Sequence, residues 1–288
     1  MSHETIVDVK TLAASLGQAS WRVVDCRFAL ADPEAGARLH AQATIPGAIH
    51  AHLDRDLSGP VIAGRTGRHP LPTREAFAAT LGGWGITAGD TQVVAFDDIG
   101  GAFAARLWWM LRWVGHRAAA VLDGGLGAWE QADGALAPGR AYDGARSTFA
   151  LGEPLVAAVS ADELLAMLDD PDVAVLDARA AARYRGEGES TDPVAGHIAG
   201  ARSAPFVGNL GEDGRFLTPE RLRARYREHL AGTSPENAIA YCGSGVTACH
   251  DLLAMTHAGL PTPRLYPGSW SEWITDPSRP RATGDEAR

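Results

Sequence analysis

The chain is poor in cysteine, in lysine and in long apolar runs. Its 288 residues include three cysteines, Cys26, Cys242 and Cys249, and a single lysine, Lys10, so arginine carries almost all of the positive charge. Three cysteines cannot all pair in disulfides, and their spacing suggests no metal site, so we expect neither a metal nor another cofactor. A chain that keeps free thiols is typical of a reducing compartment.

Charge and hydropathy exclude two kinds of partner. The net charge is −9 at pH 7 and no basic run occurs, so we expect no nucleic-acid partner. The longest apolar stretch, residues 103–114, is interrupted by Arg106 and Arg112, well short of the ~18 apolar residues that a membrane span requires. The first residues, MSHETIVDVK, contain no apolar signal segment. We therefore expect a cytoplasmic protein that does not contact a membrane.

What the chain does contain is a repeat. The segment WRVVDCR in the first half corresponds to AVLDAR in the second, and TIPGA corresponds to GHIAGA. Each half also closes with a glycine turn and tryptophans, VLDGGLGAW and LYPGSWSEW. Repeated motifs in the same order indicate two copies of one domain.

The pattern within each half predicts an α/β fold. Strands that are apolar on both faces alternate with helical patterns, which indicates a mostly parallel sheet covered by helices on both faces. We expect one domain over residues 1–137 and a second over 155–288. Residues 138–154 are rich in Gly, Ala, Pro and polar residues and are predicted to be a linker.

The most informative stretch is AYCGSGVTACH, residues 240–250. An apolar strand precedes Cys242 and a helical pattern follows it, so the cysteine lies at a strand-to-helix turn. Glycines allow a tight turn that points N–H groups inward, and the helix start adds unsatisfied N–H groups and the positive end of its dipole. Such surroundings favour a thiolate and would hold an anion attached to its sulfur. The expected substrate-binding residues of this loop are Gly243, Gly245, Val246 and Thr247.

The first half has the same loop without the cysteine. When the halves are aligned, Asp97 of AFDDIGG falls opposite Cys242. A carboxylate cannot perform thiol chemistry, so the first domain is expected to be non-catalytic.

Taken together, the CGSGVTA loop, the two halves and the IPGA and HIAGA turns resemble the tandem-domain sulfurtransferases of the rhodanese family over residues 6–276. The resemblance implies two rhodanese-like domains and a cysteine that carries a sulfane sulfur as a persulfide. Within the family, a CGSGVT loop is similar to that of the 3-mercaptopyruvate sulfurtransferases. The thiosulfate enzymes are expected to have basic residues after the cysteine, where this chain has Gly243 and Ser244.

The resemblance also implies which arginines bind the donor. Arg183 matches the family's carboxylate-binding arginine, and Arg179 and Arg185 lie nearby. A second arginine of the mercaptopyruvate enzymes has no counterpart in residues 189–193, which read ESTDP. Arg179 is equally consistent with a structural role, since an arginine after a strand-end aspartate often fixes loops of its own domain, and Arg185 with a surface role.

Three further residues are catalytic by resemblance. Ser244 matches a serine that works with a histidine and an aspartate from the first half, here His69 and Asp54. Such a relay could move the proton of the donor thiol. His50, His52 and Asp56 belong to the same region, so the sequence leaves the identity of the pair open, and Ser244 could instead only cap the turn.

The sequence leaves three functions open and excludes a fourth. The first is transfer of sulfur from 3-mercaptopyruvate to a thiol, either thioredoxin-like or of low molecular weight, or to cyanide. The alternatives are a thiosulfate:cyanide sulfurtransferase and a sulfur carrier or regulatory module without turnover. A cysteine-dependent phosphatase would need an arginine six residues after the cysteine, and Ala248 occupies that position.

Overall fold

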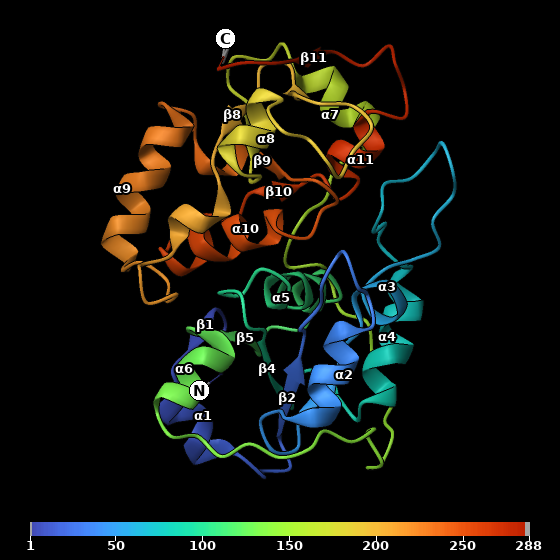
Figure 1. Ribbon diagram of the computed structural model, residues 1–288, viewed down its shortest axis with the longest axis vertical. Helices are drawn as coiled ribbons and strands as arrows, with labels where there is room; N and C mark the ends of the chain where they lie inside the picture. The colour runs from blue at the N-terminus through green and yellow to red at the C-terminus, as the bar shows by residue number, and fades with distance from the viewer. Residues whose placement is uncertain (1, 286–288) are drawn as a thin grey trace. The chain divides into compact units, whose positions relative to one another are not determined.

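The structure, a computed structural model, describes residues 2–285, and its chain divides into two compact units (Figure 1). The first unit contains residues up to 59, 71–155 and 212–216, and the second contains 60–70, 156–211 and the residues from 217 onward.

The first unit is built on a five-stranded parallel sheet with the spatial order β1-β5-β4-β2-β3. The strands β4 and β5 are buried along their length, because valine, alanine and phenylalanine face both layers of helices. The strands are β1 (Ile6–Val7), β2 (Trp21–Asp25), β3 (Ile49–His50), β4 (Gln92–Phe96) and β5 (Ala119–Leu122).

Local signals start several helices of this unit. The Asp8 side chain accepts a hydrogen bond from the Thr11 N–H, and Thr73 caps α4 by accepting from the Ala76 N–H. The most buried helix, α5, packs against β4 and β5. The helices are α1 (Val9–Ser15), α2 (Ala35–Gln42), α3 (Leu53–Asp56), α4 (Arg74–Gly83), α5 (Ala104–Trp113) and α6 (Gly125–Gln131).

The second unit repeats this plan with a four-stranded parallel sheet in the order β10-β9-β6-β8. A separate antiparallel pair joins β7 and β11. The strands are β6 (Ala174–Asp177), β7 (His197–Ile198), β8 (Arg202–Ser203), β9 (Ala238–Tyr241), β10 (Arg264–Leu265) and β11 (Arg281–Ala282).

Capping residues again mark the helix starts of the second unit. Ser160 and Glu163 form a capping box at α7, and Thr218 caps α9, whose first residue is Pro219. The α-helices are α7 (Ala161–Met167), α8 (Ala181–Arg185), α9 (Pro219–Leu230), α10 (Ala248–His257) and α11 (Ser269–Trp273), and the 3₁₀ helices are η1 (Phe206–Asn209) and η2 (Pro235–Asn237).

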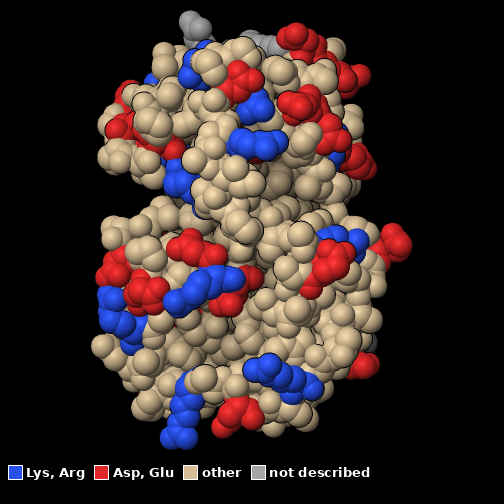
Figure 2. Space-filling model, turned by 90° about the vertical axis from the view of Figure 1, so that its right-hand side faces the viewer, with Lys and Arg blue, Asp and Glu red and all other residues tan. Residues whose placement is uncertain are grey.

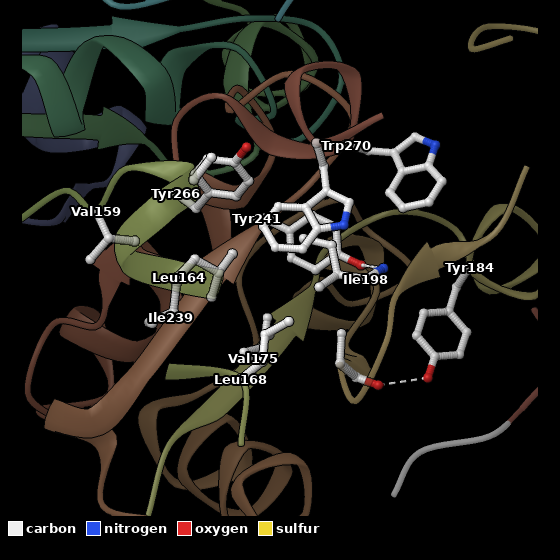
Figure 3. Close-up of a cluster of buried hydrophobic side chains, with 13 residues drawn as sticks. Val159, Leu164, Leu168, Val175, Tyr184, Ile198, Ile239, Tyr241, Tyr266 and Trp270 are labelled. Carbon is white, nitrogen blue, oxygen red and sulfur yellow. Dashed lines mark hydrogen bonds between the residues drawn. The ribbon is translucent and has the colours of Figure 1, made fainter. Parts of the chain in front are cut away.

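The core of the second unit lies between its sheet and the helices that cover it. Figure 3 shows the rings of Tyr241, Tyr266 and Trp270 among aliphatic side chains such as Ile198 and Ile239, and all five are fully buried. Parallel sheets with helical layers in both units confirm the α/β fold class predicted from the sequence.

Residues 60–70 and 212–216 each belong to the unit built mainly from the other half of the chain, and the segment expected to be a linker belongs to the first unit. Residues 60–70 come from the first half of the chain but belong to the second unit, where the Arg68 N–H donates to Ser271 Oγ over 3.1 Å. Most of residues 138–154, expected to be a linker, pack on the first unit: the Ser147 N–H donates to the Gly82 carbonyl and Phe149 is buried. Backbone hydrogen bonds and one buried ring hold this segment in place.

Acidic and basic side chains are interspersed on one face of the molecule. Figure 2 shows a face on which the two kinds alternate, with no area covered by basic side chains alone. Within residues 2–285, no helix has the length and apolar character needed to cross a membrane.

Candidate active site

Cys242 follows β9 at the carboxyl end of a central strand of the second unit, the edge where parallel sheets place their ligands. Cys242 is 2% exposed to solvent. The backbone is held on both sides: the Cys242 N–H donates to Ser269 Oγ over 3.0 Å, and the Cys242 carbonyl accepts from the Trp270 N–H over 3.0 Å. The start of α11 therefore fixes the position of the sulfur.

The loop after the cysteine turns one of its N–H groups toward the sulfur. The Gly245 N–H donates to Cys242 Sγ over 3.2 Å. Gly245 has a φ of +77°, and a Cβ at this position would collide with the Pro267 carbonyl oxygen, so only glycine fits without strain. Val246 is buried, and Thr247 is the residue before the first turn of α10. One loop N–H group, from Gly245, therefore reaches the sulfur, three residues before α10 begins.

His69 and Ser244 lie side by side. The Nδ1 atom of His69 is 2.8 Å from Ser244 Oγ, and both residues are buried. The pair forms because residues 60–70 belong to the second unit. His69, the histidine that the family resemblance matched, thus contacts the serine within one unit, whereas His50 and His52 belong to the first unit.

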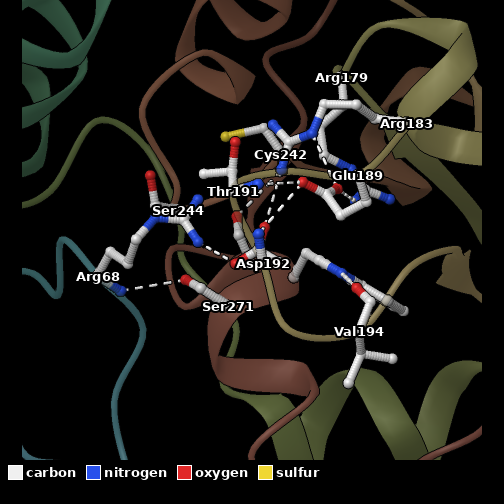
Figure 4. A network of polar contacts seen from close by, with 12 residues as sticks. Arg68, Arg179, Arg183, Glu189, Thr191, Asp192, Val194, Cys242, Ser244 and Ser271 are labelled. Carbon is white, nitrogen blue, oxygen red and sulfur yellow. Dashed lines mark hydrogen bonds and ion pairs between the residues drawn. The ribbon is translucent and has the colours of Figure 1, made fainter. Parts of the chain in front are cut away.

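Two arginines meet beside the loop, as Figure 4 shows. A Cβ placed on Gly243 would lie 2.9 Å from Arg68 Nη2 and 3.4 Å from Arg183 Nη1. These guanidinium groups come from residues 60–70 and from α8, and their side chains are 29% and 26% exposed. One guanidinium nitrogen from each of two separate segments of the chain thus lies next to Gly243, the residue that follows the cysteine.

The two arginines are tied together by buried carboxylates. Asp192 forms an ion pair with Arg68 through Oδ1 and accepts from Arg183 Nη2 through Oδ2 over 2.8 Å. Glu189 accepts from Arg183 Nε over 3.0 Å. Burial acts to raise the pKa of Glu189, but the hydrogen bonds from Arg183, Thr191 and Asp192 outweigh it and leave that pKa below its ordinary value.

Arg179 is engaged within the fold. It donates to both oxygens of Asp177 and, through Nη2, to the Gly196 carbonyl over 2.7 Å, and it is 3% exposed. Its Nη1 atom is buried without a hydrogen-bond partner in the described part of the chain. Arg185 is partly exposed and pairs with Glu187 at 2.8 Å.

The remaining predicted residue, Asp54, lies in the first unit. It belongs to the single turn of α3, where its N–H donates to His52 Nδ1 over 3.2 Å.

Asp97 of the first unit follows β4 as Cys242 follows β9, and its carboxylate accepts from the N–H groups of Ile99, Gly101, Phe103 and Ala104.

The sequence reasoning missed Arg68 and the buried carboxylates. Arg68 adjoins His69 in GRHPLP, which was a signal that a cation accompanies the histidine. Asp192 and Glu189 occupy the segment that lacks the family's second arginine, and their contact with Arg183 follows only from the folded loop. Across residues 2–285, no group of three or more His, Cys, Asp or Glu side chains is arranged to hold a metal ion.

Two α/β units, with a buried cysteine at a strand-to-helix turn of the second, define a repeated α/β protein that presents one thiol at the edge of a parallel sheet. The family model for the rhodanese-like domain matches residues 8–132 and 160–276. The chain belongs to the rhodanese family of sulfurtransferases, in its tandem-domain form.

Individual relatives agree with this assignment. The probable 3-mercaptopyruvate sulfurtransferase of Pseudomonas aeruginosa is 53% identical over 99% of this chain and 100% of the relative. The thiosulfate sulfurtransferase of Cricetulus griseus is 33% identical over 94% of this chain and 92% of its own length. Among solved structures, the 3-mercaptopyruvate sulfurtransferase from Leishmania major superposes with a TM-score of 0.82 at 32% identity, covering 94% of this chain and 74% of that one.

Proposed function

We propose that this protein transfers a sulfane sulfur from 3-mercaptopyruvate to a thiol or to cyanide through a persulfide on Cys242. The convergence of Arg68 Nη2 and Arg183 Nη1 beside Gly243 carries the proposal. It offers two donors to one carboxylate, a single residue away from the sulfur nucleophile. The donor is an α-keto acid whose carboxylate and thiol are joined by two carbons, so one molecule can contact both places. The full-length relative from P. aeruginosa supports this donor by its name.

The first half-reaction forms the persulfide. The Cys242 thiolate attacks the donor sulfur, an S–S bond forms, and the C–S bond breaks with its electron pair passing to the carbon of the leaving pyruvate enolate. The proton of the donor thiol ends on that carbon, which gives pyruvate. The Gly245 N–H, which reaches the cysteine sulfur over 3.2 Å, lies where it can stabilise the negative persulfide.

Ser244 and His69 are proposed to move that proton. Their 2.8 Å contact allows the serine to pass a proton to or from the imidazole beside the reacting sulfur. Asp54 of the first unit is proposed as the third residue of the relay, as the family resemblance implies. In this mechanism Arg179 stays bound to Asp177 and stabilises the loop. Arg185 is proposed to attract the anionic donor from the surface.

The second half-reaction returns the cysteine. An acceptor thiolate or cyanide attacks the outer sulfur of the persulfide, the S–S bond breaks, and Cys242 leaves as a thiolate. The acceptor is proposed to be a low-molecular-weight or thioredoxin-like thiol, which suits a reducing compartment such as the cytoplasm. Splitting one transfer into two displacements predicts ping-pong kinetics.

A comparison of donors tests the proposal. We expect kcat/KM for 3-mercaptopyruvate to exceed that for thiosulfate at least tenfold, about 1.4 kcal/mol of transition-state stabilisation, with cyanide as the common acceptor. A thiosulfate preference of the same size would make the protein a thiosulfate sulfurtransferase, the activity named for the C. griseus relative. Absence of turnover with both donors, with a persulfide detected on Cys242, would make it a sulfur carrier.

The relay is tested at His69. His69→Ala should lower kcat/KM for 3-mercaptopyruvate about 100-fold, because no base remains beside Ser244. Thiosulfate brings no thiol proton, so its turnover should fall much less, and this difference separates a relay from a general loss of structure. An equal loss with both donors would remove His69 from the proton path.

A further inference from the structure

The charges beside the candidate active site balance. Arg68 and Arg183 carry two positive charges, and the carboxylates of Glu189 and Asp192 that contact them carry two negative charges. Arg179 adds a positive charge that Asp177 matches at 2.6 Å, and its Nη1 atom also lies 4.0 Å from Glu189 Oε2. The pair of arginines that faces Gly243 therefore presents hydrogen-bond donors without a net positive charge.

Asp192 is placed between the two arginines. One of its oxygens is paired with Arg68 and the other with Arg183, and its side chain is 1% exposed. The nitrogens that it leaves unused, Arg68 Nη2 and Arg183 Nη1, are those nearest to Gly243. The carboxylate thus lies behind the pair and turns both guanidinium edges toward the loop (Figure 4).

Glu189 holds the segment of Asp192 in place. Its Oε1 accepts from the N–H groups of Thr191 and Asp192 over 2.8 and 3.1 Å, while Oε2 accepts from Arg183. The Glu189 side chain is 4% exposed, so its charge is screened little by solvent. Both negative charges are therefore built into the wall of the site.

We propose that Asp192, supported by Glu189, is a specificity-determining residue that positions Arg68 and Arg183 for one carboxylate and cancels their charge, so that the site selects a monoanionic carboxylate donor over a dianion such as thiosulfate. The proposal rests on the function proposed above and deepens it. A bound monocarboxylate leaves the cluster with one excess negative charge, whereas a dianion leaves it with two. Because Coulomb energy scales with charge, the dianion is penalised more.

Asp192→Asn removes one buried negative charge and keeps the shape of the side chain. We expect the ratio of kcat/KM for thiosulfate to that for 3-mercaptopyruvate to rise about tenfold, the effect of one charge several ångströms away in a partly buried site. Asp192→Glu retains the charge and should keep the ratio near that of the wild type. Asp172→Asn, the same change at an exposed position of the second unit, is the matched control and should leave the ratio unchanged.

Alkylation of Cys242 provides a readout that needs no sulfur transfer. Iodoacetate carries a carboxylate and iodoacetamide is its neutral analogue, so the ratio of their rate constants at Cys242 reports the charge that an anion meets. The modified peptide is quantified by mass spectrometry. Asp192→Asn should raise the iodoacetate:iodoacetamide ratio at least threefold, and Asp172→Asn should not change it.

Glu189→Gln makes the same charge change in the same network and serves where Asp192→Asn does not fold. Its expected effects have the same sign and are smaller, because Glu189 contacts only one of the two arginines that face Gly243. An alkylation ratio that stays within twofold of wild type in the folded variants overturns the proposal. If the wild type uses neither donor, the proposed function fails, and the alkylation ratio still decides the role of Asp192.

Discussion

The loops after β4 and β9 are two versions of one turn with different occupants. After β4, the Asp97 carboxylate fills the turn and accepts four backbone hydrogen bonds of 2.8 to 3.0 Å. After β9, Cys242 occupies the corresponding position, and its sulfur accepts from the Gly245 N–H. The first loop therefore directs its N–H groups at its own carboxyl group, whereas the second directs one N–H group at a thiol. The comparison shows that both units form a turn at the end of a central strand with inward N–H groups, and that the residue at its first position differs in charge and in chemistry.

An arginine–aspartate contact at the end of a strand occurs in both units. Arg27 donates to both oxygens of Asp25 and to the Ala43 carbonyl, and Arg179 makes the same contacts with Asp177 and the Gly196 carbonyl. The Nη2 distances are equal, 2.6 Å to the carboxylate and 2.7 Å to the carbonyl. The first unit keeps this arrangement although Asp97, not a cysteine, stands at the position that corresponds to Cys242, and this favours a structural role for Arg179.

The largest effect is expected from removing the sulfur. Cys242→Ser should lower sulfur transfer to cyanide by about 10⁴-fold or more, because a serine cannot form a persulfide. Thiocyanate formation measures this. Cys26→Ala in the first unit is the control and should retain activity, since burial raises the pKa of the Cys26 thiol well above its ordinary value and keeps it unreactive. Near-normal turnover by Cys242→Ser would exclude the persulfide mechanism.

The next largest effect is a loss of stability when Asp97, in the loop after β4, is replaced. Asp97→Asn places an amide group against backbone N–H donors, and at least two charge-assisted hydrogen bonds are lost. Burial, which raises the pKa of the Asp97 carboxyl, means that removing its charge offsets part of this loss, and the free energy of unfolding should fall by about 3 kcal/mol. Urea denaturation measures it, and Asp98→Asn at the exposed neighbouring position is the control. A stability equal to that of wild type would mean that the first loop is not organised by its carboxylate.

Arg27 and Arg179 occupy equivalent positions, so replacing either should lower stability by the same amount. The two replacements should differ in catalytic activity only if Arg179 contacts the donor. A lysine cannot make the forked contact, so Arg27→Lys and Arg179→Lys should each lower the unfolding free energy by about 2 kcal/mol. Their kcat/KM values for 3-mercaptopyruvate should agree within threefold. A tenfold loss confined to Arg179→Lys would assign Arg179 to the donor site.

The smallest effect is the pH dependence of the free energy of unfolding that Asp251 produces. Asp251 on α10 is fully buried, and burial raises its pKa to about 7, although hydrogen bonds from Asn209 and Tyr226 and the charge of Arg225 act to lower it. The folded state therefore binds a proton that the unfolded state has released. This contribution to stability is complete at low pH and is lost as the pH rises through 7, by about 1.4 kcal/mol between pH 6 and pH 8.

Unfolding at pH 6 and pH 8 measures that dependence. Asp251→Asn cannot titrate and should remove the corresponding part of the difference between the two pH values. A difference that persists unchanged in Asp251→Asn would show that another group is responsible.

Local patterns were enough to predict the repeat, the α/β class and the cysteine loop. Each depends on neighbours in sequence: the apolar run of β9, the glycines after Cys242 and the helical spacing of α10. The same local logic places Asp97 in the equivalent turn. The 2.8 Å contact between His69 and Ser244 was expected only through family resemblance, because the two residues are 175 positions apart.

The sequence by itself determined that this is a repeated α/β chain with one thiol at a strand-to-helix turn, because periodicity and glycine placement act over a few residues. Only the tertiary structure decided what surrounds that thiol. It brought Arg68 from the first half into the second unit, closed Asp192 and Glu189 around Arg183, and engaged Arg179 with Asp177. Such contacts join groups far apart in the chain, and their partners are chosen by burial and charge pairing, which arise only once the units are folded.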